Sequence, residues 1–221
     1  MNTRFLTSLK KCYREVIKEE LPPVARLSLG GNSKLKKDGI ASFSLVAGFT
    51  CPGAGECKKF CYAMRGNFLF ESPMKAGLRN YLAMKNDSFI EQIVTQILLF
   101  KVKTLRLHPA GDFHSQRAVE LWDKIAKRCP WVKFYAYTKS LKLNFNSLRR
   151  NKNFTLIQSE GGKFDELIDP RFPIAKIFKD KEEMTSKGFK DASDSDLVAL
   201  STNRVGLTPR RGTSGKMEKI I

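Results

Sequence analysis

The sequence has little acidic charge, little histidine and no regular repeat. Its 221 residues include 22 Asp and Glu against 40 Lys and Arg, which gives a formal net charge of +18. The excess is spread over both halves of the chain, so it indicates a basic surface rather than a basic tail. A surface of this kind favours anionic partners such as nucleic acid or nucleotides, although a generic solubility surface has the same composition.

Long apolar runs are also missing. The longest strongly apolar helical stretch, Ile93 to Phe100, is about eight residues, whereas a membrane-spanning helix needs ~20. The first residues lead directly into Lys10 and Lys11 without the apolar segment of a signal peptide. We therefore expect no membrane partner. Because 42% of the residues are hydrophobic, and 16 of them are Phe, the chain can still bury a real core and is not of the disordered class.

Cysteine is scarce and unevenly placed. There are five cysteines, an odd number, and three of them fall within the short segment from Cys51 to Cys61. This pattern favours a reducing compartment and a metal site over a disulfide framework. Cys12 and Cys129 lie on the apolar stripes of predicted helices, so we expect both to be packed core thiols.

The close trio, Cys51, Cys57 and Cys61, has the spacing C-x5-C-x3-C. Gly53 and Gly55 allow a tight loop in which three thiolates converge on one ion or cluster, and three soft ligands suit iron–sulfur or zinc. Structural zinc takes four protein ligands, usually from CxxC pairs, and no such pair is present. The spacing therefore favours a catalytic cluster with an open position. The alternative is three unliganded core cysteines.

Strands alternate with helices or long connections after the cysteine loop, which predicts a parallel sheet. We expect a partial (β/α)6-type barrel, with an open doubly wound α/β sheet as the alternative. A helix in residues 1–24 precedes the single α/β domain, 25–206, and a basic tail, 207–221, follows it. The apolar runs predicted as strands are 41–49, 104–108, 131–137, 154–158, 174–178 and 197–200.

Polar residues follow most of these runs at the strand ends, where α/β proteins build their sites. Because the carboxyl ends of parallel strands share one edge, we expect these residues to surround the cysteine loop in one pocket. The candidates for cofactor binding are Gly111, Asp112, Lys139, Ser140, Ser159, Glu160, Asn203 and Arg204.

The loop itself resembles the cluster loop of the radical S-adenosylmethionine (SAM) enzymes, through the segment Cys57-Lys58-Lys59-Phe60-Cys61-Tyr62-Ala63. The usual motif there is C-x3-C-x-aromatic-C, and this chain has two more residues in the first gap and one in the second. The resemblance implies a [4Fe–4S] cluster on Cys51, Cys57 and Cys61, with SAM at the fourth iron and an external electron donor. It also implies that Asp112 contacts the amino group of SAM.

Longer blocks resemble an uncharacterised family of bacteriophage proteins called gene product eighty-eight. The shared blocks are Leu27–Leu35, Phe49–Cys57, Gly111–Phe113 and Phe134–Ser140. This resemblance implies a protein that acts in the cytoplasm of the infected bacterial host, without naming an activity. We therefore expect an iron–sulfur, radical-SAM-like enzyme with a nucleotide or nucleic-acid substrate. The alternative is a non-enzymatic nucleic-acid-binding protein whose loop holds zinc or a structural cluster.

Overall fold

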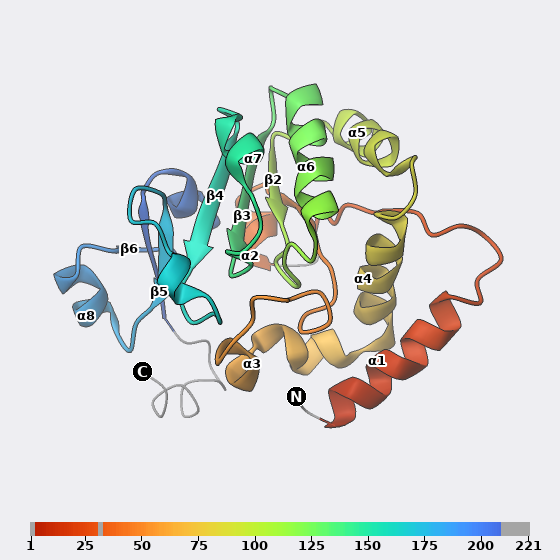
Figure 1. Ribbon diagram of the computed structural model, residues 1–221, viewed down its shortest axis with the longest axis horizontal. Helices are drawn as coiled ribbons and strands as arrows, with labels where there is room; N and C mark the ends of the chain where they lie inside the picture. The colour runs from red at the N-terminus through yellow and green to blue at the C-terminus, as the bar shows by residue number, and fades with distance from the viewer. Residues whose placement is uncertain (1–2, 31–32, 209–221) are drawn as a thin grey trace.

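The computed structural model describes residues 3–30 and 33–208, so the predicted tail, 207–221, lies outside the described residues except for its first two positions. One sheet of seven strands organises these residues, with helices packed against it (Figure 1). Every strand pairs with its neighbours in parallel, which confirms the predicted α/β class with a parallel sheet. The strands are β1 (Ala41–Phe43), β2 (Thr104–Leu107), β3 (Lys133–Thr138), β4 (Phe154–Ser159), β5 (Ile174–Ile177), β6 (Lys190–Asp191) and β7 (Arg204–Leu207).

The strand order is β1-β2-β3-β4-β5-β7-β6. Five strands therefore lie in chain order, as in a (β/α) barrel, whereas a doubly wound sheet begins near its middle. The sheet does not close within the described residues, because β1 and β6 form its two edges. The order reverses once, where β7 inserts between β5 and β6. The fold thus combines a barrel-like strand order with open edges.

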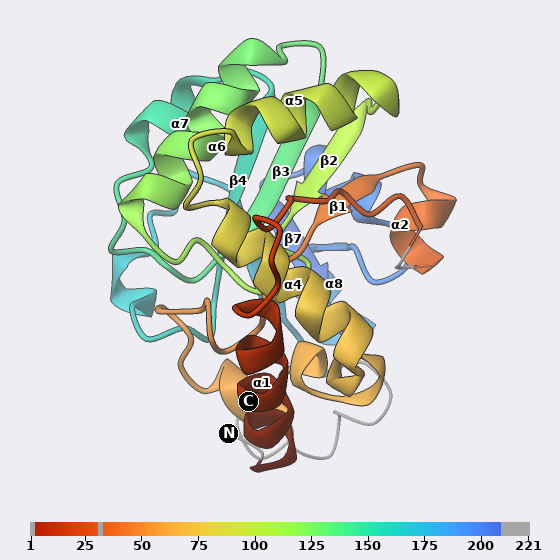
Figure 2. The ribbon, with the colours of Figure 1, turned by 90° about the vertical axis from the view of Figure 1, so that its right-hand side faces the viewer.

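The helices cover the sheet unequally. Figure 2 shows α5, α6 and α7 lying across one side of β2, β3 and β4. This side, the outer face, holds an apolar core in which Trp122, Leu107 and Phe134 are fully buried. The main helices are α1 (Thr3–Val16), α2 (Ser33–Lys37), α3 (Cys57–Phe60), α4 (Glu71–Ala83), α5 (Phe89–Leu99), α6 (Gln116–Arg128), α7 (Asn146–Arg150) and α8 (Lys181–Ser186).

The opposite side, the inner face, has a smaller core. Tyr135, Ile157 and Val205 point to it from β3, β4 and β7, and Leu35 of α2 packs against them. Side chains alternate along a strand, so each strand contributes to both cores. The described residues also form four short 3-10 helices, η1 (Tyr62–Met64), η2 (Gly66–Leu69), η3 (Asp165–Leu167) and η4 (Asp196–Leu200).

Within the segment 1–24, where the sequence predicts a helix, α1 begins at Thr3 and ends at Val16. Its apolar stripe, which includes Phe5, Leu9 and Cys12, is buried together with residues of α4 and the cysteine loop. Lys75 of α4 pairs with Glu15 of α1 at 2.6 Å, on the solvent side of this contact. None of the described helices is both long and apolar enough to cross a membrane.

Two of the predicted strands are wrong in extent or kind. The run 41–49 forms a strand only over β1, because the chain then turns, with the Thr50 N–H donating to the Val46 carbonyl at 3.0 Å. The run 197–200 is part of η4, whose start is capped by the Ser195 hydroxyl accepting from the Leu197 N–H. A short apolar run is compatible with a buried helical turn as well as with a strand. The strand predicted there is formed by β7 instead.

Candidate functional site

The cysteine loop, residues 50–61, lies at the carboxyl edge of the sheet, on the side to which the β4 arrow points (Figure 1). Its first residue, Thr50, is fully buried and accepts a hydrogen bond from the Asp112 N–H at 3.2 Å, just beyond β2. Gly111 has φ +87°, and a Cβ there would stand 2.6 Å from both Leu45 Cβ and Thr50 Oγ1. Only glycine fits this contact, which ties the loop to the end of β2.

The same loop also docks on the ends of β3 and β4. A Cβ on Gly53 would stand 1.9 Å from the carbonyl oxygen of Lys139, so the two backbones touch. The Lys163 N–H donates to the Gly53 carbonyl at 2.9 Å, and Ala54 forms an antiparallel bridge with Gly162. Three strand ends therefore hold the cysteine loop in place.

The three thiols lie at the two ends of the loop, Cys51 at its start and the other two around α3. Cys57 begins α3, Cys61 follows it, and all three cysteines are partly buried. Burial raises the pKa of each thiol, and that of Cys51 to about 12. Negative charge on Cys57 or Cys61 raises the pKa of Cys51 further. The thiols are therefore close enough to interact electrostatically, that is, within electrostatic reach of one another. Without a compensating cation, these thiols stay protonated at neutral pH.

Backbone N–H groups face the sulfurs. The Gly48 N–H donates to Cys51 Sγ at 3.3 Å. Hydrogen bonds from Gly55 to Cys57, and from Ala63 and Met64 to Cys61, oppose the rise in pKa that burial causes. Amide donors of this kind stabilise thiolates and tune the potential of clusters bound to them.

The trio is not arranged as a site for a metal ion. Among the residues that the structure describes, no group of three or more His, Cys, Asp or Glu side chains could hold a metal ion. The other two cysteines lie elsewhere. Cys12 packs in the core around α1 and Cys129 in the outer-face core, both with no exposed surface, as the helical stripes predict.

Asp112 joins the end of β2 to the end of β3. Its carboxylate accepts hydrogen bonds from the Phe113 N–H at 2.7 Å, the Thr138 hydroxyl at 2.7 Å and the Lys139 N–H at 2.8 Å. The side chain is 5% exposed, and burial raises its pKa. Its charge also acts on Cys51 and Cys57. Asp112 is therefore beside the cysteine loop, but most of its acceptor capacity is already used within the fold.

Lys139 connects the loop to the end of β4. Its ammonium donates to the Ser159 hydroxyl at 2.8 Å and to the carbonyls of Ser159 and Glu160. Burial lowers its pKa, while the nearby negative charges of Cys57 and Asp165 oppose this. In turn the Lys139 charge lowers the pKa of Cys57. Lys139 lowers the pKa of Cys57 more than Lys58 does, whereas Arg65 acts on Cys61.

Of the predicted site residues, the structure brings six to the cysteine loop: Gly111, Asp112, Lys139, Ser140, Ser159 and Glu160. Within the part of the chain that is described, the hydroxyl of Ser140 is buried without a hydrogen-bond partner. The Ser140 backbone N lies 2.8 Å from the position of a Cβ on Gly53, so this hydroxyl belongs to the same contact region. The same hydroxyl faces the Asp112 carboxylate, whose pKa it lowers.

Asn203 and Arg204 do not join this group. Arg204 begins β7 and pairs in register with Ile174, the first residue of β5. Both residues therefore lie at the amino edge of the sheet, opposite the cysteine loop. The expectation that they ring the loop is wrong, because the strand begins at Arg204 instead of ending before Asn203.

A buried charged network on the inner face escaped the sequence analysis. Arg106, in the middle of β2, and Lys34 of α2 both pair with Asp196 of η4, Lys34 at 2.5 Å, and the Tyr135 hydroxyl donates to the same carboxylate at 2.8 Å. Tyr137 stacks under the Arg106 guanidinium, and its buried hydroxyl finds no partner among the described residues. Arg106 within the apolar strand Thr104–Leu107 was the available signal, because an unpaired arginine is rarely buried.

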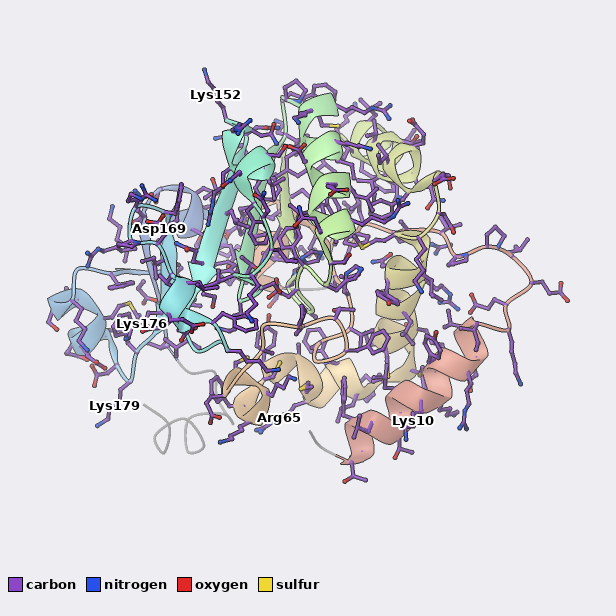
Figure 3. The ribbon with its side chains drawn as sticks, in the orientation of Figure 1. Lys10, Arg65, Lys152, Asp169, Lys176 and Lys179 are labelled. Carbon is purple, nitrogen blue, oxygen red and sulfur yellow. The ribbon has the colours of Figure 1, made fainter. Side chains whose placement is uncertain are left out.

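The basic residues labelled in Figure 3 are spread over the described surface. Figure 3 shows Lys10, Arg65, Lys152 and Lys179 projecting from different parts of the molecule and away from one another. Several other cations are paired, as Lys176 is with Glu160 at 2.9 Å. The basic residues labelled there thus do not form a single stripe that would follow a nucleic-acid backbone.

Fold and site together define a class: an α/β protein with an open parallel sheet and a three-cysteine loop clasped at its carboxyl edge. The family described as Gene product 88 matches residues 21–220, and the chain belongs to this family. The match includes the cysteine loop and all seven strands, and it supports a bacteriophage origin.

One relative is the "Gene 88 protein" of Mycobacterium phage L5, which is 25% identical over 122 residues. The aligned part covers 50% of this chain and 51% of the relative, so the chain spans about half the length of the curated relative it matches. No solved structure matches the chain.

Proposed function

We propose that this protein is an iron–sulfur enzyme of the radical SAM type, which acts on a nucleotide or nucleic-acid substrate in the cytoplasm of the infected host. The observation that carries the proposal is the trio Cys51, Cys57 and Cys61. These partly buried thiols lie within electrostatic reach of one another on a loop held by three strand ends.

The donor set suits a cluster better than a single ion. Zinc or iron alone requires its ligands within about 2.3 Å of one centre, and no group of described side chains could hold a metal ion as they stand. A four-iron cluster places each thiolate on its own iron, so its sulfurs stand further apart. Amide donors at the sulfurs and the charge of Lys139 near Cys57 would favour the thiolate forms that such a cluster needs.

With SAM, the cluster would supply one-electron cleavage of the sulfonium and hydrogen abstraction from the substrate, given an external electron donor. The chain's own contribution is to bind and to orient. The Ser140 hydroxyl is buried, makes no hydrogen bond of normal geometry among the described residues and faces Asp112, so it could turn to the polar end of SAM. Asp112 has three hydrogen bonds already and would act mainly by holding Gly111 and Lys139 beside the loop.

The first experiment is anaerobic purification and reconstitution of the full chain with iron and sulfide. We expect a brown protein that absorbs broadly near ~400 nm. Replacement of Cys51, Cys57 or Cys61 by Ala should abolish the colour. The matched controls Cys12→Ala and Cys129→Ala remove thiols that pack in apolar cores and should keep it.

The second experiment measures SAM binding to the cluster-loaded protein by equilibrium dialysis. Ser140→Ala should weaken SAM binding about tenfold without loss of iron, because a hydrogen bond to a charged group is removed. Ser186→Ala, on the exposed part of α8, is the control and should bind SAM normally.

A colourless protein with stoichiometric zinc would overturn the enzyme proposal and favour the alternative, a nucleic-acid-binding protein with a structural site. An iron–sulfur protein that fails to bind SAM would keep the cluster but remove the radical SAM assignment.

A further inference from the structure

A cavity lies at the amino edge of the sheet, opposite the cysteine loop. Its volume is about 440 Å³, within the range of small-molecule sites. Arg149 of α7, Thr155 at the start of β4, Phe172 and Asn203 line it, together with the turn that contains Ser201 and Thr202. The walls combine hydroxyl and amide groups with apolar surface from Phe154, Pro173 and Leu200.

Arg149 is the only cation that lines this cavity among the described residues. Its guanidinium stacks on the ring of Phe172, with 4.0 Å between the central carbon and the ring centroid. Its Nε is buried and has no hydrogen-bond partner in the described structure, and no described carboxylate lies within ion-pair distance of the side chain. Stacking fixes the plane of the guanidinium, so its N–H groups are held ready for an acceptor.

The nearest opposing charge is already occupied. Asp169 raises the pKa of Arg149, but burial lowers that pKa by more. The Asp169 carboxylate is held by Arg171, whose backbone N–H, Nε and Nη2 all donate to it, Nη2 at 2.6 Å. Arg149, Asp169 and Arg171 together have a net charge of +1, and of these three only Arg149 lines the cavity. A cavity with a partly desolvated, unpaired arginine is short of one anionic acceptor.

We propose that this cavity binds a small organic phosphate, with the phosphate on Arg149 and the hydroxyl-bearing turn 201–203, and an apolar or aromatic part against Phe154, Pro173 and Leu200. Arginine with hydroxyl and amide donors is the set that recognises phosphate oxygens, and the apolar wall excludes inorganic phosphate as the complete ligand. The site is independent of the proposed function, because it lies at the other edge of the sheet.

The test uses the full chain and phenyl phosphate as the probe, with inorganic phosphate and phenol in parallel. Binding is followed by calorimetry and by the ¹H–¹⁵N signal of the Arg149 Nε–H. We expect saturable binding of phenyl phosphate that shifts this signal, with weaker binding of the two part-molecules. Arg149→Gln should weaken binding about tenfold or more, because charge-assisted hydrogen bonds are lost.

Arg150→Gln is the matched control, since Arg150 is the adjacent, exposed arginine and its loss changes the net charge equally. Equal weakening in both variants, or binding that leaves the Arg149 signal unmoved, would overturn the proposal. Asn203→Ala is a second variant, on an exposed side chain, that keeps the proposal testable if Arg149→Gln folds poorly. It should weaken phenyl phosphate binding severalfold, and unchanged binding in a folded Asn203→Ala would count against the site.

Discussion

On β2, Leu105 and Leu107 belong to the apolar core of the outer face, whereas Arg106 between them belongs to the charged network of the inner face. The outer core is built from aliphatic and aromatic side chains, most of them below 5% exposed. The inner face, by contrast, buries the ion pair between Arg106 and Asp196. A buried ion pair adds little stability over an apolar pair of the same volume, yet it is costly to break. The comparison teaches that the outer face gains its stability from apolar burial, whereas the inner face adds to a smaller apolar core a polar network that is costly to break.

The sharpest test of this difference removes the centre of the inner network. Asp196→Ala leaves Arg106 and Lys34 buried without their carboxylate, so we expect a loss of about 3–5 kcal/mol in the free energy of unfolding. Urea unfolding monitored by circular dichroism measures it. Asp169→Ala, which breaks the exposed pair with Arg171, is the control and should cost below ~1 kcal/mol. Similar losses in both variants would show that the inner network is not desolvated.

On the outer face, Leu107→Ala should lower the free energy of unfolding by about 2–5 kcal/mol. Leu107 is fully buried in the same apolar core as Trp122, so its truncation leaves a cavity there. The same unfolding measurement applies. Leu98→Ala, on the 55% exposed surface of α5, is the matched leucine and should change the stability by less than ~0.5 kcal/mol. If Leu107→Ala costs less than ~1 kcal/mol, the outer face is not the main source of stability.

One residue breaks the apolar rule of the outer face. His108 follows β2 with φ +52°, and its ring is buried against Phe43, Phe113 and Trp122. Within the described residues neither ring nitrogen has a partner, and burial lowers its pKa to about 3, with a smaller contribution from the charge of His114. Between pH 6.5 and 3 the unfolded chain therefore binds a proton that the folded chain does not bind.

The stability should accordingly fall with decreasing pH, by up to ~1.4 kcal/mol per pH unit below about pH 6.5, and be unaffected by this group above it. His108→Phe should remove this slope, and any difference in strain between Phe and His at the same positive φ would change the stability equally at every pH. Urea unfolding of both proteins at about pH 7, 6 and 5 separates the two effects. His114→Phe, at a less buried ring, should flatten the slope less, and a larger effect there would contradict the assignment.

The smallest expected effect concerns the helices over the outer face. Ser115 caps α6, and its hydroxyl accepts from the Ala118 N–H at 3.2 Å. Ser115→Ala should cost about 1 kcal/mol. Ser115→Asp, which keeps the acceptor, should restore the midpoint of urea unfolding, and failure of this rescue would exclude the cap as the cause.

Elements with strong local signals could be predicted from the sequence. The apolar stripe of α1, with Leu9 and Cys12 one turn apart, requires a helix packed on one side. The cysteine loop was recognisable because Gly53 and Gly55 interrupt it, and the structure gives Gly53 a backbone contact that excludes any side chain. Polar residues after β2, β3 and β4 could be expected at one edge because these strands are parallel.

Other features depended on packing that the sequence alone does not determine. The run 197–200 is apolar enough for a strand. It forms η4 instead, and Asp196, directly before it, pairs with Arg106 and Lys34. That one change moved Asn203 and Arg204 from the carboxyl edge to the amino edge.

The sequence by itself determined which segments bury apolar surface and where three thiols stand on one loop, because these properties depend on near neighbours in the chain. Only the tertiary structure decided the strand order, the insertion of β7 between β5 and β6, and the meeting of Lys34, Arg106 and Asp196 from α2, β2 and η4. It also decided that the Asp112 carboxylate accepts hydrogen bonds from Thr138 and Lys139 at the end of β3. Such contacts join residues far apart in the chain, and their geometry exists only once the sheet has formed.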